Sequence, residues 1–133
     1  MLYNSHRKFK IWAYTVSHSS LLIRSVMKFI DEDGFSEDTS FNIDVEFWTV
    51  TFVNIPSVLS SLKIIEILGD ELPEDISRQF CNYNQKIFEL QDKNGKYYII
   101  AAGVLIGVNR WENEDRIFNY NLNLEHDEIV AKS

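Results

Sequence analysis

Residues 41–53, FNIDVEFWTVTFV, constrain the fold more than any other part of the chain. Apolar residues at positions 41, 43, 45 and 47 alternate with polar ones, the pattern of a strand with one buried face. After Phe47 the phase shifts by one residue, so that Trp48, Val50 and Phe52 become the apolar positions. A shift of one residue turns a strand over. The sequence therefore predicts either a β-bulge near Phe47 or a strand that enters a region covered on both faces.

Residues 9–16 and 21–26 are rich in aromatic and β-branched residues and flank the polar stretch Ser17-His18-Ser19-Ser20. This arrangement predicts a β-hairpin with a four-residue turn. Pairing Val16 with Leu21 gathers five apolar side chains on one core face: Trp12, Tyr14, Val16, Leu21 and Ile23. The opposite face then carries Ala13, Thr15, Leu22 and Arg24.

A second hairpin is indicated by Lys93-Asn94-Gly95 between residues 87–92 and a strand that begins at Lys96. A two-residue Asn94-Gly95 loop would set Lys93 against Lys96, which are like charges. A three-residue loop sets Asp92 against Lys96 and needs Gly95 in the left-handed region. We therefore predict the three-residue loop.

Residues 97–108, YYIIAAGVLIGV, predict a long strand that bends at Gly103 and Gly107, because two glycines and several β-branched residues disfavour a helix. The spacing of these glycines does not match a phosphate-binding loop. Further patterns predict strands at 62–68 and 116–120, a helical turn at 57–61, a short helix at 73–81 and a loose tail at 122–133. The expected fold is mainly β: one domain, residues 1–133, forming an antiparallel barrel or sandwich of about seven strands with one short helix.

Acidic residues outnumber basic ones by 20 to 13, giving a formal net charge of −7. Such a surface repels phosphate, so nucleic-acid and anionic-membrane partners are not expected. The basic cluster at residues 6–10 is interpreted as solvated charge beside a strand. The single cysteine, Cys81, precludes an internal disulfide. The apolar run at 97–108 has twelve residues, too few to span a bilayer. A cytoplasmic protein is expected.

Several stretches suggest chemistry, but none has the spacing that a site requires. Extended backbone would point His18 away from Ser17 and Ser19, so no catalytic pair is predicted. Residues 31–38, DEDGFSED, fail the calcium-loop pattern and read as a solvated acidic loop. The candidate zinc ligands are scattered: His6, His18, His126 and Cys81. We predict no metal, no cofactor and no catalytic residue, and we expect Glu66 to point outward at an edge.

A binding role draws on other residues. Trp111 lies between Arg110 and Glu112 in a predicted turn, and an exposed aromatic side chain beside an arginine is typical of an interface hot spot. Trp12 and Trp48 are assigned to the core instead. Asp31, Glu32 and Asp33 provide a candidate surface for a basic partner.

Three segments, FKIWAYTVSHSSLLIRS, FNIDVEFWTVTFVNIPS and NGKYYIIAAG, resemble parts of small uncharacterised bacterial proteins. The resemblance implies a shared all-β fold and attaches no activity or functional residue to this chain.

The function expected from the sequence is non-enzymatic binding of a protein, either a basic partner that the chain inhibits or a second copy paired through an edge strand. The alternatives are a β-barrel that holds a small ligand, or an enzyme whose site the sequence does not reveal. A ligand barrel would enclose an apolar cavity with convergent polar groups, whereas an interaction protein would have a filled interior and a conspicuous surface patch.

Overall fold

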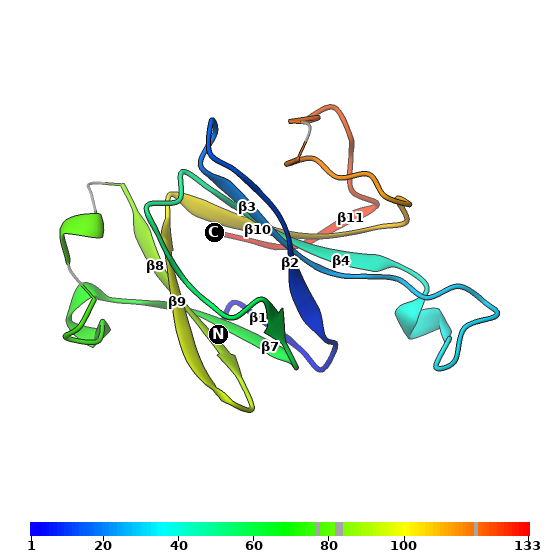
Figure 1. Cartoon of the computed structure of the whole chain (residues 1–133), viewed down its shortest axis with the longest axis horizontal. Helices are drawn as coiled ribbons and strands as arrows, with labels where there is room; N and C mark the ends of the chain where they lie inside the picture. Colours follow the sequence, from blue (N-terminus) through cyan, green and yellow to red (C-terminus); the bar gives the residue numbers. More distant parts are fainter. Residues whose placement is uncertain (77, 82–83, 119) are drawn as a thin grey trace.

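The computed structural model describes residues 1–76, 78–81, 84–118 and 120–133. Two antiparallel sheets of five and six strands face each other as a sandwich and do not close into a barrel (Figure 1). The five-stranded sheet has the order β1-β7-β8-β9-β5, and the six-stranded sheet has the order β11-β10-β4-β3-β2-β6. The expected all-β class is thus confirmed, with more strands than the seven predicted.

The strands are β1 (Tyr3–Ser5), β2 (Phe9–Thr15), β3 (Ser20–Ser25), β4 (Asn42–Trp48), β5 (Phe52–Asn54), β6 (Val58–Leu59), β7 (Leu62–Ile67), β8 (Lys86–Asp92), β9 (Gly95–Ala101), β10 (Gly103–Asn109) and β11 (Glu128–Lys132). Three short 3₁₀ turns accompany them: η1 (Glu37–Thr39), η2 (Gly69–Glu71) and η3 (Arg78–Phe80). In the described part of the chain, no helix is both long enough and apolar enough to cross a membrane.

The phase shift after Phe47 marks a change of sheet. β4 ends at Trp48, Thr49 adopts a positive φ of 52°, and β5 then joins the other sheet. Residues 97–108 also pass from one sheet to the other, because β9 and β10 belong to different sheets. The two corners lie side by side: Ala102 N donates to Trp48 O at 2.9 Å, and Thr51 N donates to Ile100 O at 2.9 Å. Neither predicted interpretation of the shift, a bulge or a doubly covered strand, was correct.

Apolar side chains from both sheets meet in one cluster. β4 and β10 supply alternate residues to it, while β7, β8 and β9 supply the facing layer. The principal buried members are Phe9, Leu21, Ile23, Ile43, Val45, Phe47, Ile64, Phe88, Leu90, Ile99, Val104 and Ile106. These side chains form the main hydrophobic core of the sandwich.

The β2–β3 hairpin forms, but in another register. Thr15 pairs with Ser20 rather than Val16 with Leu21, and the register shifts between Ile11 and Ala13. Tyr14 and Val16 are consequently exposed rather than in the core, and Trp12 packs on the outer face with Ala13 and Leu22. The predicted core face was wrong at Trp12 because the bulge between Ile11 and Ala13 turns this side chain to the outer face. Tyr14 pairs with Leu21 but is 47% exposed, and Val16 lies in the turn beyond the end of β2.

The β8–β9 hairpin also differs from both registers considered. Asp92 pairs with Gly95 across a two-residue Lys93-Asn94 loop, and Gly95 does not have a positive φ. The carboxylate of Asp92 organises this turn, accepting from Asn94 N at 2.8 Å and Gly95 N at 3.2 Å. It also accepts from the Ser60 amide and hydroxyl, which ties the hairpin to the β6–β7 turn.

The Asp92 carboxylate makes the stability of the folded protein depend on pH. Partial desolvation raises the pKa of Asp92, but the hydrogen bonds from Asn94, Ser60 and Gly95 outweigh that effect and leave the pKa below its ordinary value. A lowered pKa in the folded state stabilises the protein above the unfolded pKa, and this contribution disappears as the pH falls through the folded value. We expect Asp92→Asn to be less stable than the wild type near neutrality, with the difference shrinking below about pH 4. Urea unfolding of the wild type and of Asp92→Asn between acidic and neutral pH measures this difference in stability. A difference that does not vary with pH would contradict the lowered pKa of Asp92.

Four further predictions are corrected. Within the described residues 73–81 no α-helix forms, only turns and η3, while Ser77 lies outside the described residues. Residues 57–61 contain β6 instead of a helical turn, and the described part of 116–120 is not a strand; Asn119 is not described. Residues 122–133 are not a loose tail, because β11 pairs with β10 along its length. The strands predicted at 62–68 and 87–92 are confirmed as β7 and β8.

Candidate functional site

A row of polar side chains lies on the outer face of the six-stranded sheet. The alternation in β4 directs Asn42, Asp44 and Glu46 to this face, opposite the apolar core. The register places Asp44 between Arg24 of β3 and Gly107 of β10. All three polar residues of β4 are buried, although the sequence suggested a solvated face.

The described residues 110–118 and 120–127, which we call the crossing segment, cover this polar face. They leave the end of β10, pass over the sheet and return to start β11 (Figure 1, orange). Ile117 packs on Ala13 and Leu22 of the β2–β3 hairpin. The carboxylate of Asp115 accepts from the Ile117 amide at 2.8 Å and also from the Phe118 amide, which shapes the turn that delivers Ile117.

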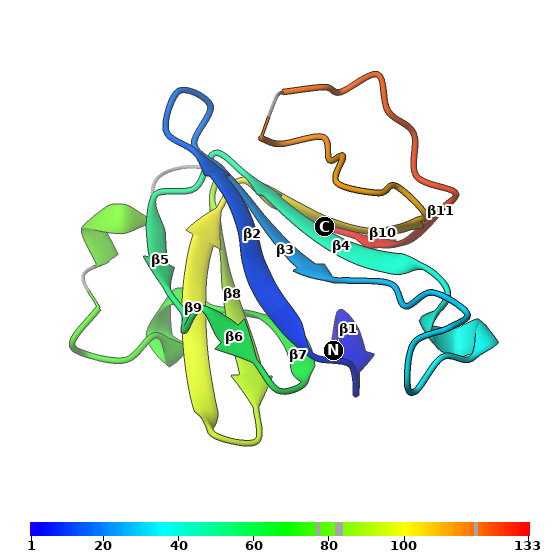
Figure 2. The same ribbon diagram turned by 45° about the vertical axis from the view of Figure 1, so that its right-hand side comes forward.

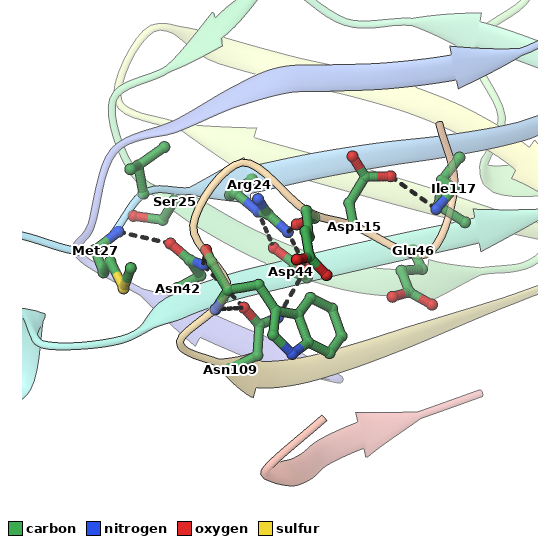
Figure 3. A network of polar contacts seen from close by, with 12 residues as sticks. Arg24, Ser25, Met27, Asn42, Asp44, Glu46, Asn109, Asp115 and Ile117 are labelled. Atoms are coloured by element: carbon green, nitrogen blue, oxygen red, sulfur yellow. Dashed lines mark hydrogen bonds and ion pairs between the residues drawn. The ribbon is translucent and has the colours of Figure 1, made fainter. Parts of the chain in front are cut away.

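Arg24 and Asp44 form a buried ion pair at the centre of the row (Figure 3). Their side chains are 1% and 0% exposed. Arg24 Nε donates to Asp44 Oδ1 at 2.6 Å and Nη2 donates to Oδ2 at 2.8 Å, a two-pronged contact. Nη2 also donates to the Glu114 carbonyl at 2.8 Å, and the Trp12 ring covers the guanidinium at 4.8 Å. The pair thus joins two strands to the crossing segment.

Two asparagines extend the network in one consistent orientation. Asn109 Nδ2 donates to Asp44 Oδ2 at 2.9 Å, and Asn109 Oδ1 accepts from Asn42 Nδ2 at 2.8 Å. Asn42 Nδ2 also donates to the Trp111 carbonyl, while Asn42 Oδ1 accepts from the Met27 amide. Because each amide group meets only complementary partners, reversing either side chain would bring donors against donors.

His126 reaches the network from the end of the crossing segment. Its side chain is 1% exposed and lies directly over Gly107, where a β-carbon would come within 2.4 Å of the ring. Nδ1 lies 3.2 Å from Asn109 Nδ2, which donates to it, so Nδ1 carries no proton. Nε2 therefore bears the proton and donates to Glu46 Oε2 at 2.7 Å. Arg116 Nη1 donates to the other oxygen, Oε1, at 2.9 Å.

Asp44, Glu46 and His126 bring three ligand-type atoms within 4.8 Å of one another. This grouping was not predicted from the sequence, because His126 was considered there only with the other histidines and Cys81, and not with the carboxylates of β4. All four carboxylate oxygens nevertheless accept hydrogen bonds from protein groups, and two guanidinium groups supply the positive charge that a divalent ion would bring. We interpret the cluster as an ion-pair network that holds the crossing segment on the sheet. Its carboxylate oxygens are satisfied, whereas the buried Nε of Arg116 has no hydrogen-bond partner among the described residues.

The network has no exposed nucleophile. Within the described residues, the His126 nitrogens contact Asn109 and Glu46 and neither contacts a hydroxyl or thiol. His18 is exposed at the β2–β3 turn, where its ring stacks on Tyr120 at 3.6 Å. The Ser20 hydroxyl donates to the His18 carbonyl, which is a turn contact rather than activation of a nucleophile.

The second feature is residues 26–41, between β3 and β4, which we call the acidic excursion. It projects from one end of the sandwich and contains η1 (Figure 2, cyan). Its five acidic side chains are all exposed: Asp31, Glu32, Asp33, Glu37 and Asp38. Beside them Ile30 is 84% exposed and Phe29 is 46% exposed. The excursion thus presents apolar side chains among carboxylates.

Of the two other predicted binding residues, Trp111 lies at the base of the excursion and Arg110 lies elsewhere. Trp111 is half-buried, with its ring tilted against that of His126 at a centroid distance of 5.0 Å, so it is less exposed than predicted. It shares with Phe29 the lining of a cavity of about 200 Å³ at the base of the excursion. Arg110 is exposed and lines a different cavity with Asp127 and Glu128. Glu66 is exposed, as predicted, and accepts from the Ser133 hydroxyl at 2.7 Å.

Sequence reasoning missed Arg24, Asn109 and His126 as members of one site. A signal existed in β4, where a run of polar residues alternates with core residues, and in Arg24 within a nearly apolar strand. The sequence could not show that a segment sixty residues later would bury that face.

Comparison with protein-family models, with curated proteins and with solved structures gives no match. The functional argument consequently depends on the geometry of the chain itself.

Proposed function

We propose that this protein is a non-enzymatic binding protein that uses the acidic excursion to hold a basic protein partner, as an inhibitor or antidote. The observation that carries the proposal is the exposed Ile30 and Phe29 beside five exposed carboxylates on an ordered loop. An apolar centre with a charged rim is the arrangement found at binding hot spots.

The charge of the excursion supports a basic partner. Residues 26–41 contain five acidic residues and one basic residue, Lys28, and therefore carry −4 of the chain's net −7. A local excess of one sign speeds the encounter with an oppositely charged surface and disfavours wrong partners. The exposed apolar side chains would then provide the short-range contact that charge alone does not give.

The excursion is organised before binding. The Lys28 amide donates to the Thr39 carbonyl at 2.8 Å, which closes the base of the loop. The Phe29 amide donates to Glu32 Oε1 at 2.8 Å, and Arg7 Nη1 donates to the Asp38 carbonyl at 3.3 Å. Because these contacts already fix the loop, binding costs less conformational entropy than it would for a flexible segment.

Affinity capture from native lysate tests the proposal. We expect a basic protein to be retained at low salt and released as salt is added, because screening weakens exposed charge pairs. Asp31→Lys with Asp33→Lys, and separately Ile30→Ser, should each reduce capture about tenfold or more.

The matched control is Asp70→Lys with Glu74→Lys, which gives the same net charge on an exposed loop of the other sheet. Capture that falls equally in the control and in the excursion variant would contradict a specific acidic surface, and so would capture that does not change in Ile30→Ser.

A further inference from the structure

A cavity of about 480 Å³ lies beside the base of the acidic excursion, and its lining is basic. It opens where β6, β2 and the end of β3 meet residues 26–39. The lining residues include five cationic side chains and no carboxylate: Arg7, Lys8, Lys10, Arg24 and Lys28. This concentration stands out in a chain with 20 acidic and 13 basic residues.

Strand register explains how the charges gather. Val58 of β6, Lys10 of β2 and Arg24 of β3 are successive cross-strand neighbours. Arg24 is neutralised on its far side by Asp44, whereas Lys10 has a like charge opposite it. Like charges in directly opposed positions destabilise a sheet. Lys10 Nζ lies 5.1 Å from the Trp12 ring, which offsets part of this cost without neutralising the charge.

Arg7 adds a fixed positive charge. Its Nε donates to Ser25 Oγ at 3.0 Å, and Nη2 donates to the Phe41 carbonyl at 2.8 Å. Among the described residues, the acceptors of its hydrogen bonds are uncharged carbonyl and hydroxyl groups, and none is a carboxylate. Burial lowers the pKa of Arg7, with Tyr3 opposing the shift. The guanidinium is thus held in place, and no carboxylate in the described part of the chain forms an ion pair with it.

The lysines leave donors free for a ligand. Lys28 Nζ donates to the Asp33 carbonyl at 2.8 Å, which leaves two of its three hydrogens. Lys8 and Lys10 are exposed at the cavity mouth. In the described part of the chain, the ion pairs within 4.0 Å involve Arg24, Lys96, Arg116 and His126, so Arg7, Lys8, Lys10 and Lys28 pair with no carboxylate.

We propose that this cavity binds a small molecule bearing a phosphate group. Lysine ammonium groups act as point charges toward phosphate oxygens, while Arg7 supplies a fixed field behind them. The volume lies within the range of small-molecule sites, and Val26, Val58 and Phe9 offer an apolar wall for the rest of the ligand. The basic cluster at residues 6–10 is therefore part of a ligand site rather than only solvated charge.

Titration with pyrophosphate at about 50 mM salt, followed by amide chemical shifts, tests the site. We expect saturable shifts confined to residues 7–10, 25–28, 39 and 58. Lys8→Gln with Lys28→Gln should weaken binding about tenfold or more, because it removes two direct charges. Lys63→Gln with Lys93→Gln makes the same change in net charge away from the cavity and should alter the dissociation constant less than about twofold.

Shifts spread over lysines throughout the chain, equal weakening in the two double variants, or no saturation by about 10 mM pyrophosphate would each overturn the proposal. Inorganic sulfate in place of pyrophosphate should bind more weakly at the same residues, since it carries less charge. Lys28 belongs to the excursion and donates to the Asp33 carbonyl, so Lys8→Gln alone separates the two proposals: it lies outside residues 26–41 and should weaken pyrophosphate binding without altering capture of the protein partner.

Discussion

Arg24→Met is expected to destabilise the protein by about 3–5 kcal/mol, the largest effect of any single substitution considered for this fold. The change leaves the carboxylate of Asp44 buried at 0% exposure without its cation. It also removes the donor to the Glu114 carbonyl, so one anchor of the crossing segment is lost. Urea unfolding measures the effect as a lower midpoint at an unchanged slope.

Two companion variants make this measurement decisive. Arg24→Met combined with Asp44→Leu replaces both charges with apolar groups of similar size and should recover most of the loss, because no unpaired charge remains. Arg110→Met removes an exposed arginine and should change stability by less than about 0.5 kcal/mol. A loss below about 1 kcal/mol in Arg24→Met would show that water or rearrangement compensates Asp44.

Gly107→Ala is expected to cost about 2–4 kcal/mol, which is unusual for the addition of one methyl group. The new β-carbon would lie 2.4 Å from His126 Cγ, closer than two such atoms approach. The ring must therefore move away from Glu46 and Asn109 and leave polar groups without partners. Thermal and urea unfolding should both report the loss.

A double-mutant cycle tests whether the clash with His126 causes the loss of stability in Gly107→Ala. In a His126→Ala background the ring is absent, so adding Gly107→Ala should cost much less than it does in the wild type. Gly69→Ala serves as the matched control, since no atom lies within 4 Å of the added carbon and its φ is not positive. Equal costs in the two backgrounds would mean that Gly107 matters for the strand backbone and not for His126.

The polar network shows which features of the site could not be predicted from sequence patterns. Alternation in residues 41–47 correctly separated the core residues Ile43 and Val45 from the polar Asp44 and Glu46. The same alternation is produced by a face in water and by a face covered with a complementary polar segment, because both need polar side chains. Burial of Asp44 was therefore not predictable from β4 alone.

The lining of the cavity proposed for a phosphate group could likewise be predicted only in part. Residues 6–10 were visible as a basic cluster, but Lys28 joins them only because residues 26–39 fold back beside β2. The acidic excursion, in contrast, was recognised directly as a polar loop, since its charges are local in the sequence and lie outside any paired strand.

The sequence by itself determined the all-β class, the two hairpins and strands β4, β7 and β8, because side-chain alternation and turn residues act over a few positions. It also indicated unusual backbone at Phe47-Trp48 and at Gly103. Only the tertiary structure decided that these are corners between two sheets, since a strand keeps or changes sheets according to which partners it finds. The hairpin registers and the order of β11 were decided in the same way, by a bulge, by Asp92 and by pairing with β10. Long-range pairing brought Arg24, Asp44 and His126 together, and no local pattern encodes contacts such as that between Glu46 and His126, which are 80 residues apart in the sequence.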